Sequence, residues 1–373
     1  AAGREAAPAG AAIARVAIHP AIGICRVGGS REWFHAPEVP GLPPRPAGGF
    51  KDASGLIKKQ VQRFCVYAFD GQGRVIGELT GKQAEITWTV RVANTKAAWY
   101  GFTNPLDQGA AAPGVPGRRR NQYLVSPADR ARMLVIDSGD RAISGAGTNP
   151  RGDGAAYRMT GRFLDRQDVT LGHLRTDREG RLLIFPADGR SGSPTGLPIT
   201  NFADNDGWYD DLCDGPVDAR VKLPDGRILD ADGAWVASVG PDFAPEIPPI
   251  TTLYDVVADL NVREGWEKAP ARPLSFRQHI YPIFRRLALM EWVGSAANLR
   301  RGWLPIGDFS DPAYLTRLAD PGARNAAFRR SVFGHFRKPD MGDRAYVDQR
   351  KKLPYMLGDG IDYNGSPLQW FQY

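Results

Sequence analysis

Hydrophobic and polar residues alternate along most of the first 245 residues, and the alternating stretches end in Gly, Pro, Asn or Asp. A period of two is typical of antiparallel strands, in which one face is buried and the other is solvated. The early stretches are IARVAIHP, GICRVGGS, QRFCVYAFD, RVIGELTG and EITWTVRVAN. Two turns, FDGQGRVI and LPDGRI, carry the Asp and Gly residues that close β-hairpins.

The alternation resumes after residues 103–122, a stretch rich in Gly, Pro and Arg that we expect to be a surface loop. Further strands are predicted within RMLVIDSGDRAISG, GRFLDRQDVTLGHLRTDREGRLLIFPADG and GPVDARVKLPDGRILDADGAWVASVGPDFAP. Residues 13–247 therefore predict one β-rich domain of antiparallel sheets, sandwich-like in its layering. The Ala- and Gly-rich residues 1–12 predict a disordered tail.

The pattern changes after the proline cluster FAPEIPPIT. In TTLYDVVADL and SFRQHIYPIFRRLALMEWVGSAAN the apolar residues recur three and four positions apart, which predicts helices, with Thr251 and Ser275 as candidate N-caps. Residues 248–373 are therefore expected to form a helical region. The fold class predicted from these patterns is α+β, a β-rich body followed by helices.

Composition supports turns and short strands, because the chain of 373 residues contains 43 glycines and 30 prolines. The net charge of +7 comes from 48 Lys and Arg against 41 Asp and Glu. The compact basic runs are short, so we interpret the charge as solvated surface rather than a nucleic-acid site.

No apolar run is long enough for a membrane span, and no Sec signal is recognisable. A cytoplasmic location and export by another route both stay open.

Cysteines and histidines do not form a metal motif in the sequence. Cys25, Cys65 and Cys213 include no C-x-x-C pair, and the five histidines include no H-x-x-x-H pair. Cys25 and Cys65 each stand among apolar neighbours in a predicted strand. We expect buried thiols there, and a disulfide between the two strands is the alternative.

An acidic stretch, FADNDGWYDDLCDGP at residues 202–216, is the strongest concentration of candidate chemistry. Asp204, Asp206 and Asp210 supply the oxygen ligands that calcium prefers, but the EF-hand glutamate and the preceding helix are absent. The alternative is an acidic loop whose aspartates accept hydrogen bonds from the backbone of turns. The residues leave both interpretations open.

Several long motifs resemble one family. AIGICRVGGS, FKDASGLIKKQVQRFCVYAFD, ITWTVRVANTKAAWYGF, LGHLRTDREGRLLIF, NDGWYDDLCDGPVDARV and LPYMLGDG are similar, in order and wording, to segments of the LodA-like proteins. That family includes L-lysine ε-oxidase and glycine oxidase, which use a cysteine tryptophylquinone made from the enzyme's own side chains. The resemblance implies oxidative deamination of an amino acid or primary amine by O2 to give H2O2 and ammonia, a flavoprotein maturase and an oligomer.

The resemblance also implies that the quinone lies outside this chain. In the family the cofactor cysteine and tryptophan follow the segment that resembles LPYMLGDG, and Trp370 lies upstream of the position expected for that tryptophan. We therefore expect an N-terminal portion, with the quinone and the catalytic base on a further C-terminal segment or a second subunit. Residues 350–373, which end in PLQWFQY, are expected to pack with the preceding helices against that missing part.

Within this chain, the resemblance places NDGWYDD beside the channel that leads to the quinone. It implies a role for Tyr209 in activity and cofactor formation, with Trp208, Asp210 and Asp211 as further channel candidates. Two function classes remain at this point. One is the quinone-dependent oxidase, and the other is a non-catalytic scaffold or binding chain with the family fold, with calcium at residues 204–214 as one option.

Overall fold

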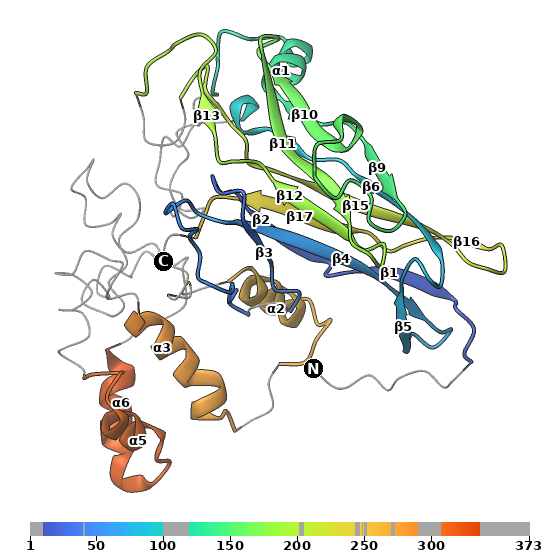
Figure 1. Cartoon of the computed structure of the whole chain (residues 1–373). Coiled ribbons are helices and arrows are strands. Elements are labelled where there is room, and N and C mark those ends of the chain that lie inside the picture. The colour runs from blue at the N-terminus through green and yellow to red at the C-terminus, as the bar shows by residue number, and fades with distance from the viewer. Residues whose placement is uncertain are drawn as a thin grey trace. The chain divides into compact units, whose positions relative to one another are not determined.

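The computed structural model describes residues 10–39, 42–99, 119–200, 205–242, 252–269, 273–289 and 307–335, together with residues 247 and 249 (Figure 1). The structure divides into two compact units, the first with the described residues up to 242 and the second with those from 247 onward, and each unit is described by itself. The predicted domain ranges 13–247 and 248–373 and the tail at residues 1–12 stay predictions, because the described part omits residues 1–9, 243–246 and 336–373. No helix in the described part is both long and apolar enough to cross a bilayer.

The first unit is β-rich, as predicted. Its strands are β1 (Arg15–His19), β2 (Ile22–Arg26), β3 (Trp33–His35), β4 (Lys59–Phe69), β5 (Val75–Leu79), β6 (Glu85–Val90), β7 (Ala93–Asn94), β8 (Ile136–Asp137), β9 (Arg141–Ser144), β10 (Arg158–Phe163), β11 (Gln167–Thr176), β12 (Leu182–Pro186), β13 (Ser191–Gly192), β14 (Tyr209–Asp210), β15 (Cys213–Lys222), β16 (Ile228–Asp230) and β17 (Ala234–Val239). Both predicted hairpins form, β4 with β5 and β15 with β16.

Fifteen of these strands form one mixed sheet, and β13 pairs separately with β14. The main path runs β10, β11, β12, β4, β2, β17, β15, β6, β9. Most pairs are antiparallel, but β2 pairs with β17 and β3 with β4 in parallel. The sheet is nearly closed, because β10 at one end of the path also contacts β8. At that contact, a Cβ on Gly161 of β10 would lie 2.6 Å from the backbone nitrogen of Asp137.

Two glutamine side chains connect β2 to β4 where the two backbones pair at a single position, Arg26 with Gln60. The Nε2 of Gln60 donates to the Ile24 carbonyl at 2.8 Å, and the Oε1 of Gln62 accepts from the Ile24 N–H at 3.0 Å. Both glutamines are buried. Gly23 makes room for this joint, since a Cβ there would lie 2.5 Å from the Gln62 Cγ.

A continuous apolar core fills the inside of the first unit. Its largest fully buried side chains include Trp88, Phe64 and Phe163. The indole Nε1 of Trp88 donates to the Gly180 carbonyl at 3.0 Å, so its polar group is satisfied within the core. All three cysteines are free and buried, which confirms the expectation of buried thiols at Cys25 and Cys65.

One helix of the first unit was not predicted. The structure forms α1 at Pro127–Leu134, so the first residues of RMLVIDSGDRAISG are helical and its strands are limited to β8 and β9. The signal was present in the sequence, because Ser126 caps the helix and Pro127 occupies its first turn. Two short 3₁₀ turns, η1 (Lys96–Ala98) and η2 (Ala155–Tyr157), complete this unit.

The second unit is helical in its described residues. Its elements are α2 (Leu253–Arg263), a π-helical turn η3 (Phe276–Ile280), α3 (Tyr281–Leu289), α5 (Pro312–Ala319), η5 (Ala323–Asn325) and α6 (Ala326–Gly334). Ser275 caps η3 as predicted. The cap of α2 is Thr252 rather than Thr251, because Thr252 forms a reciprocal capping box with Asp255. Residues 290–306 and 350–373, which carried further predictions, lie outside the described residues.

Gly215 on β15 tests how tightly the sheet is packed. A Cβ on Gly215 would lie 1.9 Å from the Arg91 carbonyl oxygen, a backbone atom that cannot move aside freely. We expect Gly215→Ala to lower the free energy of unfolding by about 1–3 kcal/mol, measured by urea denaturation. Gly71→Ala is the control, since a Cβ there meets no atom within 4 Å. Equal stability of the two variants would contradict the close approach.

Candidate functional site

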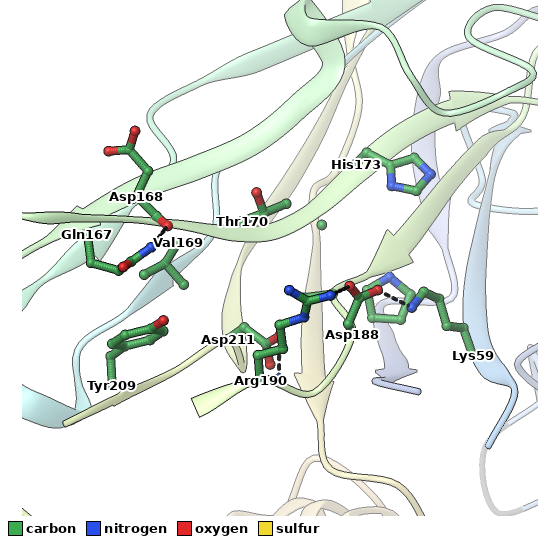
Figure 2. Close-up of a pocket in the computed structure, with 13 residues that line it drawn as sticks. Lys59, Gln167, Asp168, Val169, Thr170, His173, Asp188, Arg190, Tyr209 and Asp211 are labelled. Atoms are coloured by element: carbon green, nitrogen blue, oxygen red, sulfur yellow. Dashed lines mark hydrogen bonds and ion pairs between the residues drawn. The ribbon is translucent and has the colours of Figure 1, made fainter. Parts of the chain in front are cut away.

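A cleft of about 330 Å³ opens in the first unit between β11 and the segment that leads from β12 to β14, within the size range of small-molecule sites. Figure 2 shows Tyr209 at one end of this cleft, Lys59 and His173 at the other, and Asp188, Arg190 and Asp211 between them. Its lining residues are Lys59, Gln167, Asp168, Val169, Thr170, Gly172, His173, Pro186, Ala187, Asp188, Arg190, Tyr209 and Asp211.

Tyr209 lies on β14, which pairs with β13 so that Tyr209 faces Gly192. Its ring packs against the fully buried Phe163 with 5.6 Å between ring centroids. Within the described part of the chain, its hydroxyl makes no hydrogen bond. The ring is therefore held by packing while the phenol oxygen stays available to a ligand.

Trp208 and Asp210 lie beside Tyr209 but face a second hollow of about 190 Å³. The Trp208 Nε1 donates to the Leu197 carbonyl at 2.8 Å. The Asp210 carboxylate accepts from the Asn94 amide at 2.9 Å and from the Lys96 ammonium at 2.6 Å. The polar groups of both residues are thus engaged within the protein, whereas the Tyr209 hydroxyl is not.

A buried arginine organises the backbone near this stretch. Arg130 of α1 is buried, and its guanidinium donates to carbonyl groups at 2.9–3.0 Å. The four acceptors are the carbonyl oxygens of Ala98, Arg120, Asn121 and Leu124. One side chain therefore ties residue 98 to residues 120–124.

Asn121, whose carbonyl Arg130 binds, forms hydrogen bonds with the acidic stretch. It is fully buried and has a left-handed backbone with φ of 52°, a conformation that asparagine tolerates. Its backbone N–H donates to Asp206 at 2.7 Å, and its Oδ1 accepts from the Gly207 N–H at 2.6 Å. The turn immediately before Trp208 and Tyr209 is consequently fixed from both sides.

Asp211 is the unusual carboxylate of the cleft. Its side chain is buried, and one oxygen accepts from the N–H groups of Arg190 at 2.7 Å and Gly189 at 3.0 Å. The other oxygen, Oδ1, has no hydrogen-bond partner among the described residues. Burial raises the pKa of Asp211, and the two backbone hydrogen bonds oppose this rise only in part.

Three charged side chains form a connected group next to Asp211. The Asp188 carboxylate binds the Lys59 ammonium at 2.7 Å and the Arg190 guanidinium at 3.3 Å. Burial acts to raise the pKa of Asp188, but the hydrogen bond and charge of Lys59 hold it below its ordinary value. Asp188 is therefore an anion at neutral pH and keeps both cations at the cleft.

His173 contributes a neutral ring to the same wall. It stacks on Phe185 with 4.8 Å between centroids, and its Nε2 accepts from the Arg175 guanidinium at 3.0 Å. Burial, together with the positive charge of Arg175, lowers the pKa of His173 to about 4. The ring is consequently uncharged at neutral pH and does not offset the anions of the cleft.

The calcium interpretation finds no assembled ligand set within the described ranges. Asp204 lies outside them, Asp206 receives the Asn121 N–H, and Asp210 is paired with Lys96. No group of three or more His, Cys, Asp or Glu residues that could hold a metal occurs among the residues described. Calcium binding at residues 204–214 stays a prediction.

The structure brings only some of the predicted candidates together. Asp211 lines the cleft, Trp208 and Asp210 line the neighbouring hollow, and Tyr209 lines both. Sequence reasoning missed other members of the cleft, namely Lys59, His173, Asp188 and Arg190. Lys59 and His173 stand within segments that resemble the family, but no local pattern marks any of the four as a site residue, because strand pairing gathers them from β4, β11 and the connection after β12.

The raised pKa of Asp211 gives a testable pH dependence. An acid whose pKa is higher in the folded state binds more protons folded than unfolded, so its contribution to stability falls as pH rises through the window above the ordinary Asp pKa. Asp211→Asn removes this titration. We expect the stability difference between variant and wild type to change in the variant's favour as pH rises from about 4 to 8, measured by thermal unfolding.

Asp168→Asn is the control for this measurement, because Asp168 lines the same cleft but has a side chain that is 70% exposed. A stability difference for Asp211→Asn that does not vary with pH would mean that Asp211 is not a buried acid with a raised pKa.

Solved structures of one enzyme share this fold. The crystal structure of the L-Lys epsilon-oxidase from Marinomonas mediterranea matches with a TM-score of 0.64 and 27% identity over 87% of this chain and 50% of that chain. The structure of its Schiff base intermediate with L-Lys matches with a TM-score of 0.65 and 27% identity over 92% of this chain and 53% of that one. These matches agree with the β-rich body described above.

The sequence comparisons lead to the same group. L-lysine 6-oxidase from Marinomonas mediterranea is 30% identical over 393 aligned positions, which cover 95% of this chain and 52% of the relative. The chain thus spans about half the length of this relative. The model of the L-lysine epsilon oxidase N-terminal family matches residues 19–238, more than half of the chain. The chain therefore belongs to the L-lysine epsilon oxidase family, through the region that corresponds to its N-terminal part.

Proposed function

We propose that this chain is the N-terminal portion of a cysteine tryptophylquinone-dependent amino-acid oxidase. The reaction would be oxidative deamination of a primary amine with O2, which gives H2O2 and ammonia. The observation that carries the proposal is the family match over residues 19–238. The resemblance of the whole chain to an L-lysine 6-oxidase supports an amino acid as substrate. A flavoprotein maturase and an oligomeric assembly are further parts of the proposal.

The described cysteines do not fit the quinone. The Cys25 thiol donates to the Ile184 carbonyl at 3.3 Å, and the Cys213 thiol to the Leu171 carbonyl at 3.6 Å. Burial raises the pKa of Cys25 and of Cys65 to about 12, which keeps both as unreactive thiols. We therefore propose that the cofactor residues belong to a further segment or a second subunit.

The contribution of this chain would be a wall of the substrate channel. Tyr209 offers a hydroxyl that makes no hydrogen bond within the described residues, on a ring that packs against Phe163. Asp211 offers a carboxylate oxygen that is also without a partner in the described structure. A primary amine is a donor for both groups, and a cleft that presents unmatched acceptors favours a ligand that supplies donors.

The direct test is peroxide production by the full-length protein coexpressed with a maturase. Each of the amino acids, including L-lysine and glycine, would be supplied in turn, with H2O2 and ammonia measured together. Equal amounts of the two products, dependent on O2, would support the proposal. Absence of both products from a protein that contains the quinone would favour a non-catalytic chain.

Tyr209→Phe should lower turnover or quinone content by about tenfold, the factor that corresponds to roughly one hydrogen bond. The folded state should keep its stability, since within the described residues the hydroxyl makes no hydrogen bond. The measurements are steady-state peroxide production, quinone absorbance and thermal unfolding. Tyr67→Phe is the matched control, because Tyr67 is a half-buried tyrosine of β4 that packs on His19. Wild-type activity and quinone content in Tyr209→Phe would remove Tyr209 from the channel.

A polypeptide of residues 1–373, separated under denaturing conditions, should not react with a redox-cycling quinone stain at alkaline pH. The reason is that Cys25, Cys65 and Cys213 are buried in the β-rich unit, and the resemblance places the cofactor cysteine after the segment LPYMLGDG, outside this chain. The intact mass should equal that of the unmodified sequence. Staining of this polypeptide would place a cross-linked cysteine and tryptophan within it and would refute the proposed location of the cofactor.

A further inference from the structure

Asp211, one of the residues that line the cleft, has one buried carboxylate oxygen without a hydrogen-bond partner in the described structure. Of the buried side-chain atoms in the described structure that lack a hydrogen bond, the Asp211 Oδ1 is the sole carboxylate oxygen. Asp211 is only 4% exposed, and its other oxygen is fixed by two backbone N–H groups. The carboxylate therefore cannot rotate to satisfy Oδ1 without losing those two bonds. A donor from outside the described chain is needed to complete it.

The same cleft carries two cations on one anion. Asp188 holds both Lys59 and Arg190, and Arg190 also lies next to Asp211 through its backbone N–H. The Arg190 side chain is 79% exposed, whereas that of Lys59 is 12% exposed. Arg190 can consequently turn away from Asp188 at little cost, and Lys59 would still neutralise Asp188. Figure 2 shows Arg190 between Asp188 and Asp211.

We infer that this cleft binds the zwitterionic head group of a free amino acid. The ligand's α-ammonium donates to the Asp211 Oδ1, and its α-carboxylate accepts from the Arg190 guanidinium, a geometry that suits bidentate pairing. The inference rests on the proposed function in taking an amino acid as the ligand. It adds which part of the substrate this chain recognises and which residues do so.

The charges of the cleft match a ligand with no net charge. Lys59 and Arg190 supply two positive charges and Asp188 supplies one negative charge, and an ammonium bound at Asp211 would favour the charged form of that carboxyl group. Asp168 pairs on the surface with Arg162 at 3.6 Å, and His173 is neutral. A zwitterion leaves this group balanced, whereas a simple amine or a simple carboxylic acid leaves one charge of the cleft unmatched.

The position of the head group also sets the direction of the side chain. Asp211 and Arg190 lie in the middle of the cleft and Tyr209 lies at one end, with Val169 and Gln167 on the facing strand (Figure 2). A head group on Asp211 therefore leaves the ligand's side chain free to extend past the Tyr209 hydroxyl. The cleft volume of about 330 Å³ accommodates an amino acid of ordinary size.

Three ligands that differ only in the head group test this inference. L-Norleucine has both charges, hexanoate lacks the ammonium, and pentylamine lacks the carboxylate. Binding to the full-length protein would be measured anaerobically by isothermal titration calorimetry. We expect norleucine to bind at least about tenfold more tightly than either single-charge ligand, because each lost charge removes one charge-assisted contact.

Two variants assign the contacts. Asp211→Asn should lower the affinity for norleucine and for pentylamine at least about tenfold and leave the affinity for hexanoate unchanged. Arg190→Gln should lower the affinity for norleucine and for hexanoate and leave the affinity for pentylamine unchanged. Glu85→Gln replaces an exposed carboxylate outside the cleft lining and should change none of the three affinities. Arg190 is exposed, so its replacement reports on binding even if Asp211→Asn does not fold.

Equal affinities for the three ligands, absence of norleucine binding, or unchanged norleucine affinity in folded Asp211→Asn would each overturn the inference. The measurement is independent of turnover. Norleucine binding with the expected variant pattern, in a protein that forms no peroxide, would overturn the proposed oxidase but keep the head-group site. If the protein forms peroxide but neither variant changes its affinity for norleucine, the proposed oxidase would stand and the head-group site would be overturned.

Discussion

The joint between β2 and β4 is the constraint on which the rest of the first unit depends. The sheet path passes from β12 and β4 to β2 and β17 through this one connection, and the side chains of Gln60 and Gln62 supply hydrogen bonds that the backbones do not. The cleft has walls from both sides of it, because β11 lies before the joint and the residues leading into β15 lie after it. The two buried amides therefore hold those walls together with the hydrogen bonds from Gly189 and Arg190 to Asp211.

The acidic stretch shows how one residue type takes three roles within six positions. Asp206 accepts from the backbone of Asn121, Asp210 forms an ion pair with Lys96, and Asp211 is fixed by one oxygen and left open at the other. Burial and partners make the difference, and both come from distant segments. The residue with the largest unmet hydrogen-bonding capacity is also the one that no local pattern distinguishes from its neighbours.

The sequence predicted the strands, both hairpins and the change to helices, because those features follow from the spacing of apolar residues and from turn chemistry. It did not predict the parallel pairing of β2 with β17, since register across a distance of more than 200 residues leaves no local trace. The residues of the candidate site likewise include some that the sequence predicted and some that it did not. Tyr209 and Asp211 came from a contiguous motif, while Lys59, His173, Asp188 and Arg190 are gathered by folding and have no shared motif. Helix α1 was overlooked although Ser126 and Pro127 mark its start.

Arg130 makes one short helix responsible for the shape of two other parts of the first unit. Its guanidinium binds the carbonyl groups of Ala98 and Arg120, and the neighbouring Asn121 holds the backbone N–H of Gly207. A change in the position of α1 would therefore displace the turn before Trp208, although that turn lies far along the chain from the helix.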